Sequence, residues 1–168
     1  MSRFVPDMYF KSIFDIDYDK LKSSGIKVLL YDFDNTIIEK GVNRVNDDIR
    51  NLFCDLKSDF IIYVVSNSLN SSKLKVVCDS IGLFYIGNAR KPFKFGYKKL
   101  SFDDIGVDRI AMIGDQIITD VWGANRMGYC SVLIDPITNS EHIWTKVNRV
   151  FEGIIFKRNH MKRGNYYD

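Results

Sequence analysis

Residues 26–36 read Ile-Lys-Val-Leu-Leu-Tyr-Asp-Phe-Asp-Asn-Thr, an apolar run that ends abruptly in two carboxylates. The apolar part, Val28–Tyr31, follows a glycine and is too short for a stable helix, so it predicts a strand buried on both faces of a parallel sheet. Ligands of open parallel sheets bind beyond the C-terminal ends of the strands. We therefore expect Asp32 and Asp34 to lie at a ligand site. Because two neighbouring acids repel each other and resist burial, that site should hold a cation or a proton between them.

Length and composition indicate an ordinary globular protein. The chain has 168 residues, of which 46% are hydrophobic and 27% charged, and this suits one domain over residues 1–168. No apolar run approaches the roughly 18 residues that span a bilayer, and the first residues lack the apolar core of a secretory signal. The cysteines Cys54, Cys78 and Cys130 are odd in number and widely spaced, which predicts reduced core cysteines. These features favour a cytoplasmic protein.

Breakers and apolar periodicity divide the chain into alternating strands and helices. This alternation predicts a doubly wound, Rossmann-like parallel α/β sheet with right-handed crossovers. Residues 1–25 should form an N-terminal extension that packs on the first strand, and Asn46 should cap the second helix. The predicted strands are 28–31, 60–65, 83–86, 109–113 and 130–134, and the predicted helices are 19–24, 47–57, 71–80, 90–100, 119–127 and 140–157.

The net charge of +3 lies entirely in residues 140–168, which carry six bases and three acids. This segment is expected to form a C-terminal helix and a basic tail. Its charge favours either a simple solvated tail or contact with an anionic partner such as phospholipid or nucleic acid. The sequence leaves both interpretations open.

Polar residues follow the ends of successive predicted strands, and in this architecture those ends line one crevice. Several carboxylates together bind a hard cation, and Mg²⁺ suits an all-oxygen site that shares a substrate phosphate. A lysine and a hydroxyl instead suit the remaining phosphate oxygens. The residues are Asp32, Asp34, Ser66, Asn67, Lys91, Asp115 and Asp120.

Each of these residues has an ordinary structural interpretation when it is taken alone. An acidic pair often begins a loop, Ser66 could cap a strand end, and Lys91 could be a surface lysine. Asp115 and Asp120 could be helix N-terminal acids that the dipole favours. All of them in this order, each at a strand end, are hard to obtain by packing alone, and together they predict a phosphoryl-transfer site.

The motifs resemble those of the haloacid dehalogenase (HAD) superfamily. Residues 32–36 are similar to its D-x-D-x-T motif, Ser66 and Lys91 to its second and third motifs, and residues 114–120 to its G-D-x-x-x-x-D motif. The closer resemblance is to the YqeG-type subgroup of the subclass IIIA phosphatases. It extends through Val-Pro-Asp at 5–7, Lys-Ser-Ile at 11–13, Arg-Lys-Pro at 90–92 and Asn-Arg-Met-Gly at 125–128, and so covers most of the chain.

The resemblance implies a Mg²⁺-dependent phosphatase that works through an aspartyl-phosphate. Asp32 would attack phosphorus, and Asp34 would protonate the leaving oxygen and then take a proton from water. The metal would be held by the carboxylates of Asp32 and Asp115 and by the carbonyl oxygen of Asp34. Asp120 would contact the metal through water and would also orient Lys91.

The remaining motif residues are expected to contact the phosphate or the substrate. Ser66 would donate to a phosphoryl oxygen, and Lys91 would offset its charge. Thr36 would fix the loop beside the substrate by hydrogen bonding. Asn67, Arg90 and Arg126 would contact substrate, although surface or capping roles fit them equally well.

The short segments between motifs leave room for no cap domain, so the site should be open. Water exclusion must then come from the substrate, a partner or a membrane, which favours a bulky substrate. A mitochondrial relative of the subgroup acts on phosphatidylglycerophosphate, so the resemblance admits a lipid phosphate and peripheral membrane contact.

Two other classes of protein share some of these sequence features. A catalytically weak scaffold for RNA, ribosomes or a protein is favoured by the basic C-terminus but opposed by the complete set of acids. A phosphorelay receiver shares the strand-end acids and the lysine, but the order of the motifs does not fit it. The sequence leaves the oligomeric state and a nucleic-acid partner undecided.

Overall fold

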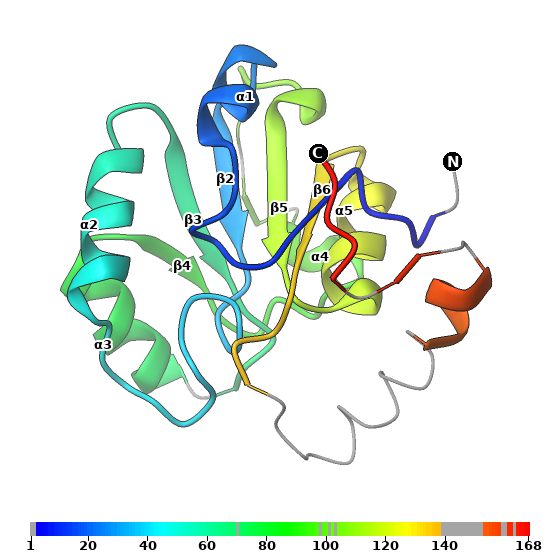
Figure 1. Cartoon of the computed structure of the whole chain (residues 1–168). Coiled ribbons are helices and arrows are strands. Elements are labelled where there is room, and N and C mark those ends of the chain that lie inside the picture. The colour runs from blue at the N-terminus through cyan, green and yellow to red at the C-terminus, as the bar shows by residue number, and fades with distance from the viewer. Residues whose placement is uncertain are drawn as a thin grey trace.

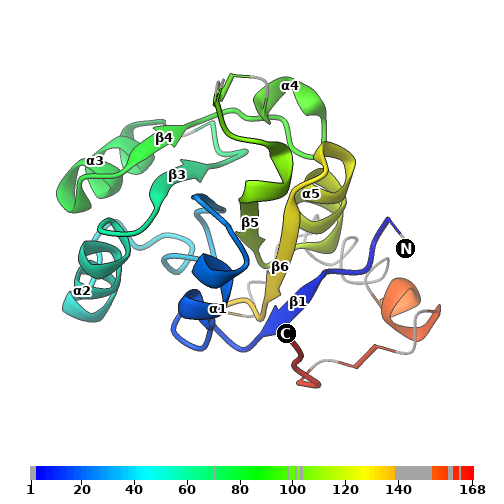
Figure 2. The same ribbon diagram turned by 90° about the horizontal axis from the view of Figure 1, so that it is seen from above.

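One sheet of six parallel strands forms the centre of the protein (Figures 1 and 2). The structure is a computed structural model that describes residues 3–69, 71–97, 99–100, 102, 104–138, 153–158, 161–162 and 164–168. The strand order is β1-β6-β5-β2-β3-β4, which confirms the predicted doubly wound α/β sheet. The strands are β1 (Met8–Phe10), β2 (Val28–Tyr31), β3 (Ile61–Val65), β4 (Phe84–Ile86), β5 (Ile110–Gly114) and β6 (Cys130–Ile134).

Helices cover both faces of the sheet (Figure 2). On one face lie α1 (Tyr18–Ser23), α2 (Asp47–Leu56) and α3 (Ser71–Ile81), and on the other lie α4 (Lys94–Tyr97) and α5 (Trp122–Met127). Short helical turns at Val107–Arg109 and Ile117–Val121 precede and follow β5. No helix in the described ranges is both long and apolar enough to cross a bilayer.

Strand β2 shows why the sheet is buried on both faces. Successive side chains of a strand point to opposite faces, so an all-apolar strand must be covered twice. Leu29 and Tyr31 pack into the core beneath α1, α2 and α3, whereas Val28 and Leu30 pack into the core beneath α4 and α5. All four residues are fully buried, as the sequence predicts.

Helix α2 begins and faces the sheet as its sequence dictates. The side chain of Asn46 accepts a hydrogen bond from the backbone N–H of Ile49 at 2.9 Å, which is an N-cap. Two aspartates occupy the first turn, where the helix dipole favours negative charge. Its buried residues, Ile49, Phe53 and Leu56, are spaced to lie on one side of the helix.

The N-terminal extension contains a strand that the sequence analysis missed. Strand β1 pairs with β6, with Tyr9 opposite Leu133. Later residues of the extension contact the first predicted strand, since the hydroxyl of Tyr31 donates to that of Tyr18 at 2.8 Å and Leu21 shares a core cluster with Leu29. The C-terminal residues of the chain also pair with β1, where Tyr9 and Tyr167 exchange two backbone hydrogen bonds of 2.6 and 2.9 Å. Phe156 packs edge-on against the ring of Tyr9 in the same cluster.

Three further predictions differ from the structure. The helix predicted at 90–100 is confined to α4, because the α conformation is disfavoured for the residue before a proline. The helix predicted at 119–127 begins as a π-helical turn at Ile117–Val121. Cys54 is exposed, although Cys78 is buried and Cys130 half-buried, and all three are free thiols. The helix predicted at 140–157 falls largely outside the described residues, of which 153–158 are helical.

Close packing between α4 and the preceding loop requires a glycine at position 96. A Cβ atom on Gly96 would lie 1.8 Å from the carbonyl oxygen of Ala89, which is backbone and cannot move aside cheaply. We therefore expect Gly96→Ala to lower the free energy of unfolding by about 1–3 kcal/mol in urea titrations. Gly153→Ala is the control, because nothing lies within 4 Å of its added Cβ. Equal stability of the two variants would contradict this packing argument.

Candidate active site

Carboxylates from the two central strands meet at the C-terminal edge of the sheet. Asp32 follows β2, Asp115 follows β5, and Asp120 lies in the π-helical turn beyond it. Each offers an oxygen atom within 4.8 Å of the others, and all three residues are buried. The topology thus assembles three of the predicted site residues into one acid cluster.

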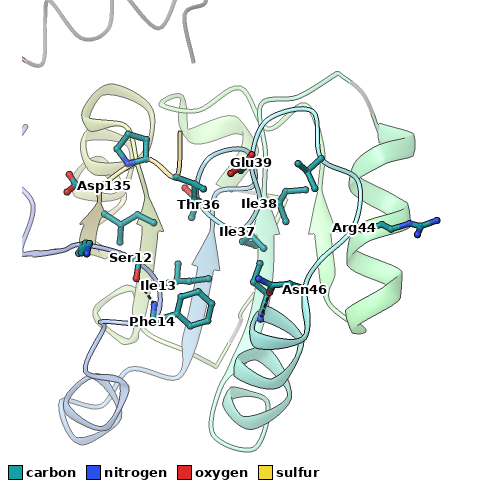
Figure 3. A pocket seen from close by; sticks show the side chains of 16 residues that line it. Ser12, Ile13, Phe14, Thr36, Ile37, Ile38, Glu39, Arg44, Asn46 and Asp135 are labelled. Atoms are coloured by element: carbon teal, nitrogen blue, oxygen red, sulfur yellow. Dashed lines mark hydrogen bonds between the residues drawn. The ribbon is translucent and has the colours of Figure 1, made fainter. Parts of the chain in front are cut away.

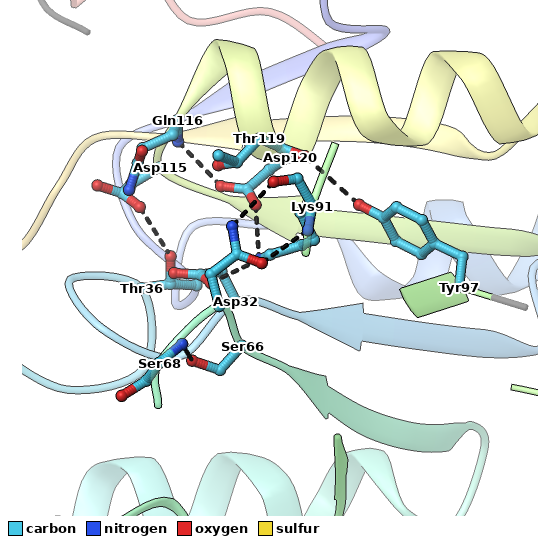
Figure 4. A network of polar contacts seen from close by, with 11 residues as sticks. Asp32, Thr36, Ser66, Ser68, Lys91, Tyr97, Asp115, Gln116, Thr119 and Asp120 are labelled. Carbon is cyan, nitrogen blue, oxygen red and sulfur yellow. Dashed lines mark hydrogen bonds and ion pairs between the residues drawn. The ribbon is translucent and has the colours of Figure 1, made fainter. Parts of the chain in front are cut away.

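Lys91 brings the balancing charge from the loop after β4 (Figure 4). Its Nζ atom donates to Asp32 at 2.5 Å and to Asp120 at 2.7 Å. Its side chain is only 1% exposed. Sequence alone allowed a solvated surface lysine at this position, and the structure excludes that interpretation.

Burial and charge act in opposite directions on this group of residues. Burial raises the pKa of Asp32 to about 6, and the charge of Lys91 offsets only part of this rise. Burial on its own would lower the pKa of Lys91, but the carboxylates of Asp120 and Asp32 outweigh it and raise that pKa. Lys91 therefore remains a cation, whereas Asp32 can be protonated close to neutral pH when no metal is bound.

The G-D-x-x-x-x-D motif is explained by local geometry. The π-helical turn folds Asp120 back so that its Oδ2 atom accepts a hydrogen bond from the N–H of Gln116 at 3.1 Å. A Cβ atom on Gly114 would lie 2.3 Å from that same oxygen, so only glycine leaves room for it. π-Helical turns of this kind often occur at functional sites.

The predicted second and third motifs are joined by the side chain of Asn67. Its amide donates to the carbonyl oxygen of Lys91 at 2.9 Å and accepts from the N–H of Lys91 at 2.7 Å. These contacts fix the backbone of Lys91, so substrate binding by Asn67 stays a prediction. The buried hydroxyl oxygen of Ser66 accepts from the N–H of Ser68 at 3.0 Å, which leaves its proton available for another acceptor.

Asp34 has a partner that the sequence analysis missed. Its carboxylate lies outside the acid cluster and pairs with the Nζ atom of Lys73 at 2.8 Å. Lys73 comes from the first turn of α3 and also lies 5.0 Å from the centre of the Phe33 ring. A cation in a first turn opposes the helix dipole, and this was the available signal that Lys73 has another role.

The other predicted residues lie around the edge of the site. Thr36 is buried and donates to Asp115 at 3.5 Å, so it holds the loop against the acid cluster. Arg90 is exposed, with its guanidinium 5.7 Å from the centre of the Phe95 ring. Arg126 donates to the carbonyl oxygen of Pro92 at 3.2 Å. These contacts neither assign nor exclude substrate contact for the two arginines.

A groove of about 540 Å³ opens beside Thr36 (Figure 3). It lies between the loops that follow β1, β2 and β6, and most of its lining is apolar, including Phe14, Ile38 and Ile137. Lys11 and Arg44 also line it. Its volume falls in the range of about 300–1,000 Å³ that is usual for ligand pockets.

The donor set of the acid cluster fits a hard divalent cation. All donors are carboxylate oxygens, close enough to be bridged by one ion. Lys91 contacts one oxygen each of Asp32 and Asp120, and the other Asp120 oxygen accepts from Gln116. The second oxygen of Asp32 and the carboxylate of Asp115 would therefore supply ligands to a metal. The carboxylate of Asp34 pairs with Lys73 outside the acid cluster, so a metal ligand from Asp34 would have to be its backbone carbonyl, as the family resemblance implies.

Comparison with known proteins defines the class first. The family model described as HAD-hydrolase-like matches residues 88–140. The structure of the HAD-hydrolase YfnB from Bacillus subtilis, solved with magnesium bound, shares the fold with a TM-score of 0.54, although its sequence is only 13% identical. The likeness covers 71% of this chain and 91% of that one. The fold is thus that of a HAD-like hydrolase.

Closer relatives then give the family. The Bacillus subtilis (strain 168) protein described as "Probable phosphatase YqeG" is 31% identical over 150 residues, which cover 89% of this chain and 87% of the relative. The chain therefore belongs to the YqeG-like phosphatases of the HAD-like superfamily, and it is a phosphatase.

A third relative and a second family model carry the name of a substrate. The Arabidopsis thaliana protein "Phosphatidylglycerophosphate phosphatase 1, chloroplastic/mitochondrial" is 26% identical over 147 residues. The match covers 82% of this chain but 42% of that relative. The model described as Mitochondrial PGP phosphatase matches residues 1–81.

The raised pKa of Asp32 predicts how stability depends on pH when no metal is present. A carboxyl group whose folded pKa is about 6 and whose unfolded value is 3.8 stabilises the fold fully below the lower value. This contribution is lost as the pH rises through about 6. Between pH 4 and 7 in EDTA, the wild type should lose roughly 2–3 kcal/mol of unfolding free energy relative to Asp32→Asn.

Urea unfolding at several pH values measures this difference. Asp79→Asn serves as the control, because Asp79 is exposed on α3, where it forms a surface ion pair with Lys75 at 2.8 Å. A constant stability difference between the wild type and Asp32→Asn over this pH range would contradict the assignment.

Proposed function

We propose that the protein is a Mg²⁺-dependent phosphatase of subclass IIIA, which hydrolyses a phosphate monoester through an aspartyl-phosphate on Asp32. The observation that carries this proposal is the buried contact of Asp32 with Lys91 inside the acid cluster. A bound Mg²⁺ supplies positive charge that offsets the repulsion between a carboxylate and a phosphate. Asp32, Asp115, the carbonyl oxygen of Asp34 and, through water, Asp120 would hold it.

In the first step, a carboxylate oxygen of Asp32 forms a bond to phosphorus in line with the leaving group. The bond between phosphorus and the ester oxygen breaks, and its electron pair goes to that oxygen. Protonated Asp34 transfers its proton to the leaving oxygen. Ser66 donates to a phosphoryl oxygen, and Lys91 offsets the negative charge on the transferring group.

In the second step, water attacks the phosphorus of the aspartyl-phosphate. The carboxylate of Asp34 takes a proton from this water, and the bond between phosphorus and Asp32 breaks. The products are inorganic phosphate and a regenerated carboxylate on Asp32. Lys91 and Asp120 retain their ion pair throughout, which keeps the nucleophile in place between turnovers.

We further propose that the substrate is a bulky, amphiphilic phosphate such as a phosphatidylglycerophosphate-like lipid. Three observations support it: the plant relative and the second family model carry that name, the described segments between motifs contain no cap, and an apolar groove adjoins Thr36. Thr36, Asn67 and Arg90 are the residues proposed to contact the substrate. The enzyme would then act in the cytoplasm at a membrane surface.

Replacing the nucleophile tests the mechanism. Asp32→Asn should lower Mg²⁺-dependent hydrolysis of an aryl phosphate by roughly 10³-fold or more, because an amide cannot form the acyl-phosphate. Asp79→Asn should retain full activity, and circular dichroism should confirm that both variants fold. Substantial turnover by Asp32→Asn would reject the assignment of the nucleophile.

A panel of sugar, nucleotide, alkyl and lipid phosphates then tests substrate size. The proposal of a bulky substrate loses its support if sugar phosphates are turned over equally well.

The ion pair of Asp34 and Lys73 makes a separate prediction. Without Lys73 the carboxylate of Asp34 is no longer held, so Lys73→Met should lower kcat by about tenfold. The loss should be larger for alkyl than for nitrophenyl phosphates, because an alkoxide needs the proton from Asp34 more. Lys73→Arg should restore activity in part, and Lys75→Met on the exposed side of α3 should have no effect. Equal losses for both classes of leaving group would show that Lys73 does not act through Asp34.

A further inference from the structure

Large apolar side chains are exposed on the loops that follow five of the six strands. Because the sheet is entirely parallel, these loops all lie at the edge that carries the acid cluster. Leu69, after β3, is 82% exposed, and Phe93, two residues beyond Lys91, is 61% exposed. We call this set the site rim, and it comprises Phe14, Val42, Leu69, Phe93, Phe95 and Ile137.

The sheet order places the site rim on both sides of the acid cluster. Asp32 and Asp115 follow the central strands β2 and β5. Phe14 and Ile137 follow β1 and β6 on one flank, whereas Leu69 follows β3 on the other flank. Six of the thirteen large apolar side chains exposed in the described part of the chain lie at this edge, and exposed apolar groups that gather around a site mark an interaction surface.

Cations lie among these apolar side chains. Lys11, Lys40, Arg44 and Arg90 are exposed on the same loops, and Lys94 is exposed at the start of α4. The acids there, outside the acid cluster, are Asp15, Asp17, Asp34, Glu39 and Asp135, and four of them are engaged within the protein. Asp34 pairs with Lys73, and Asp17 accepts from the backbone N–H of Lys20. Ser12 donates to Asp15, and Tyr166 donates to Asp135 at 2.7 Å. Outside the acid cluster, this edge therefore presents five exposed bases and apolar side chains, while four of its five acids are engaged by other groups of the protein.

We propose that this edge docks on an anionic lipid bilayer, with the site rim inserted among the lipids and the cations facing their head groups. Aliphatic and aromatic side chains with interspersed bases are the chemistry that binds such a surface. The aliphatic members Val42, Leu69 and Ile137 offer nothing to a nucleic-acid partner, which needs hydrogen bonds or stacking. The inference rests on the proposed function only in that the docked edge carries the phosphatase site.

Docking would also supply what the open site lacks. The groove beside Thr36 is lined by Phe14, Val42 and Ile137, which are members of the site rim. An inserted rim therefore opens this groove toward the apolar layer rather than toward water. A phosphate presented at the bilayer surface would reach the acid cluster, while the lipids exclude water from around it.

Vesicle sedimentation with the full chain tests the proposal. Wild-type protein should pellet with vesicles of phosphatidylglycerol and phosphatidylcholine, but much less with phosphatidylcholine alone, and added salt should weaken the binding. Leu69→Asp and Phe93→Asp should each lower the partition coefficient by about tenfold or more, since each forfeits the burial of a large apolar side chain. Both residues are largely exposed, so neither change removes core packing.

Val107→Asp is the matched control. Val107 is 51% exposed and lies just before β5, at the opposite edge of the sheet, so this change should leave vesicle binding unaltered. Equal weakening by Val107→Asp, or no binding of the wild type to anionic vesicles, would overturn the proposal. Retention on RNA without retention on vesicles would also overturn it.

A second readout separates this proposal from the proposed function. Mg²⁺-dependent hydrolysis of a soluble aryl phosphate is measured on the same preparations, and Asp32→Asn should still bind vesicles although it lacks turnover. Vesicle binding without any wild-type turnover would reject the phosphatase mechanism and support the docking edge. Turnover without vesicle binding would support the phosphatase mechanism and reject the docking edge.

Discussion

Two buried carboxylates, those of Asp32 and Asp120, share the single cation of Lys91, and the geometry of the site depends on this contact. A buried charge without a partner is strongly disfavoured, so each of the two acids requires the lysine and the lysine requires the acids. Their segments follow β2, β4 and β5, and the ion pairs therefore tie three loops to one point. The bonds between Asn67 and the backbone of Lys91 add the loop after β3.

The sheet explains why such distant residues can meet at all. In a parallel sheet every strand delivers its C-terminal residue to the same edge, so strand order alone decides which side chains become neighbours. Strands β2 and β5 are adjacent at the centre, and they bring Asp32 and Asp115 together. Neighbouring β3 and β4 bring Ser66 and Lys91 from one side. A close approach at Gly114 then admits the side chain of Asp120.

Much of this arrangement could be read from the sequence, because a short apolar run that ends in polar residues is typical of a buried parallel strand. The acids, Ser66 and Lys91 were found in this way. Strand β1 was missed because three residues beside a polar loop carry no periodicity, and its pairing with β6 depends on contacts 124 residues apart. Lys73 was missed because its partner Asp34 lies 39 residues away, and its place in a first turn signals an unusual role without identifying the partner.

The pairing of Tyr9 with Tyr167 has a consequence for the outer border of the sheet. A border strand exposes a row of unpaired N–H and C=O groups, which other chains can use as a template for aggregation. Here the C-terminal residues cover part of that border, and Lys20 and Asp168 join across it at 2.9 Å. Residues near Tyr167 thus cover backbone groups that could otherwise pair with another chain. Removing or displacing them by truncation or fusion is expected to lower solubility.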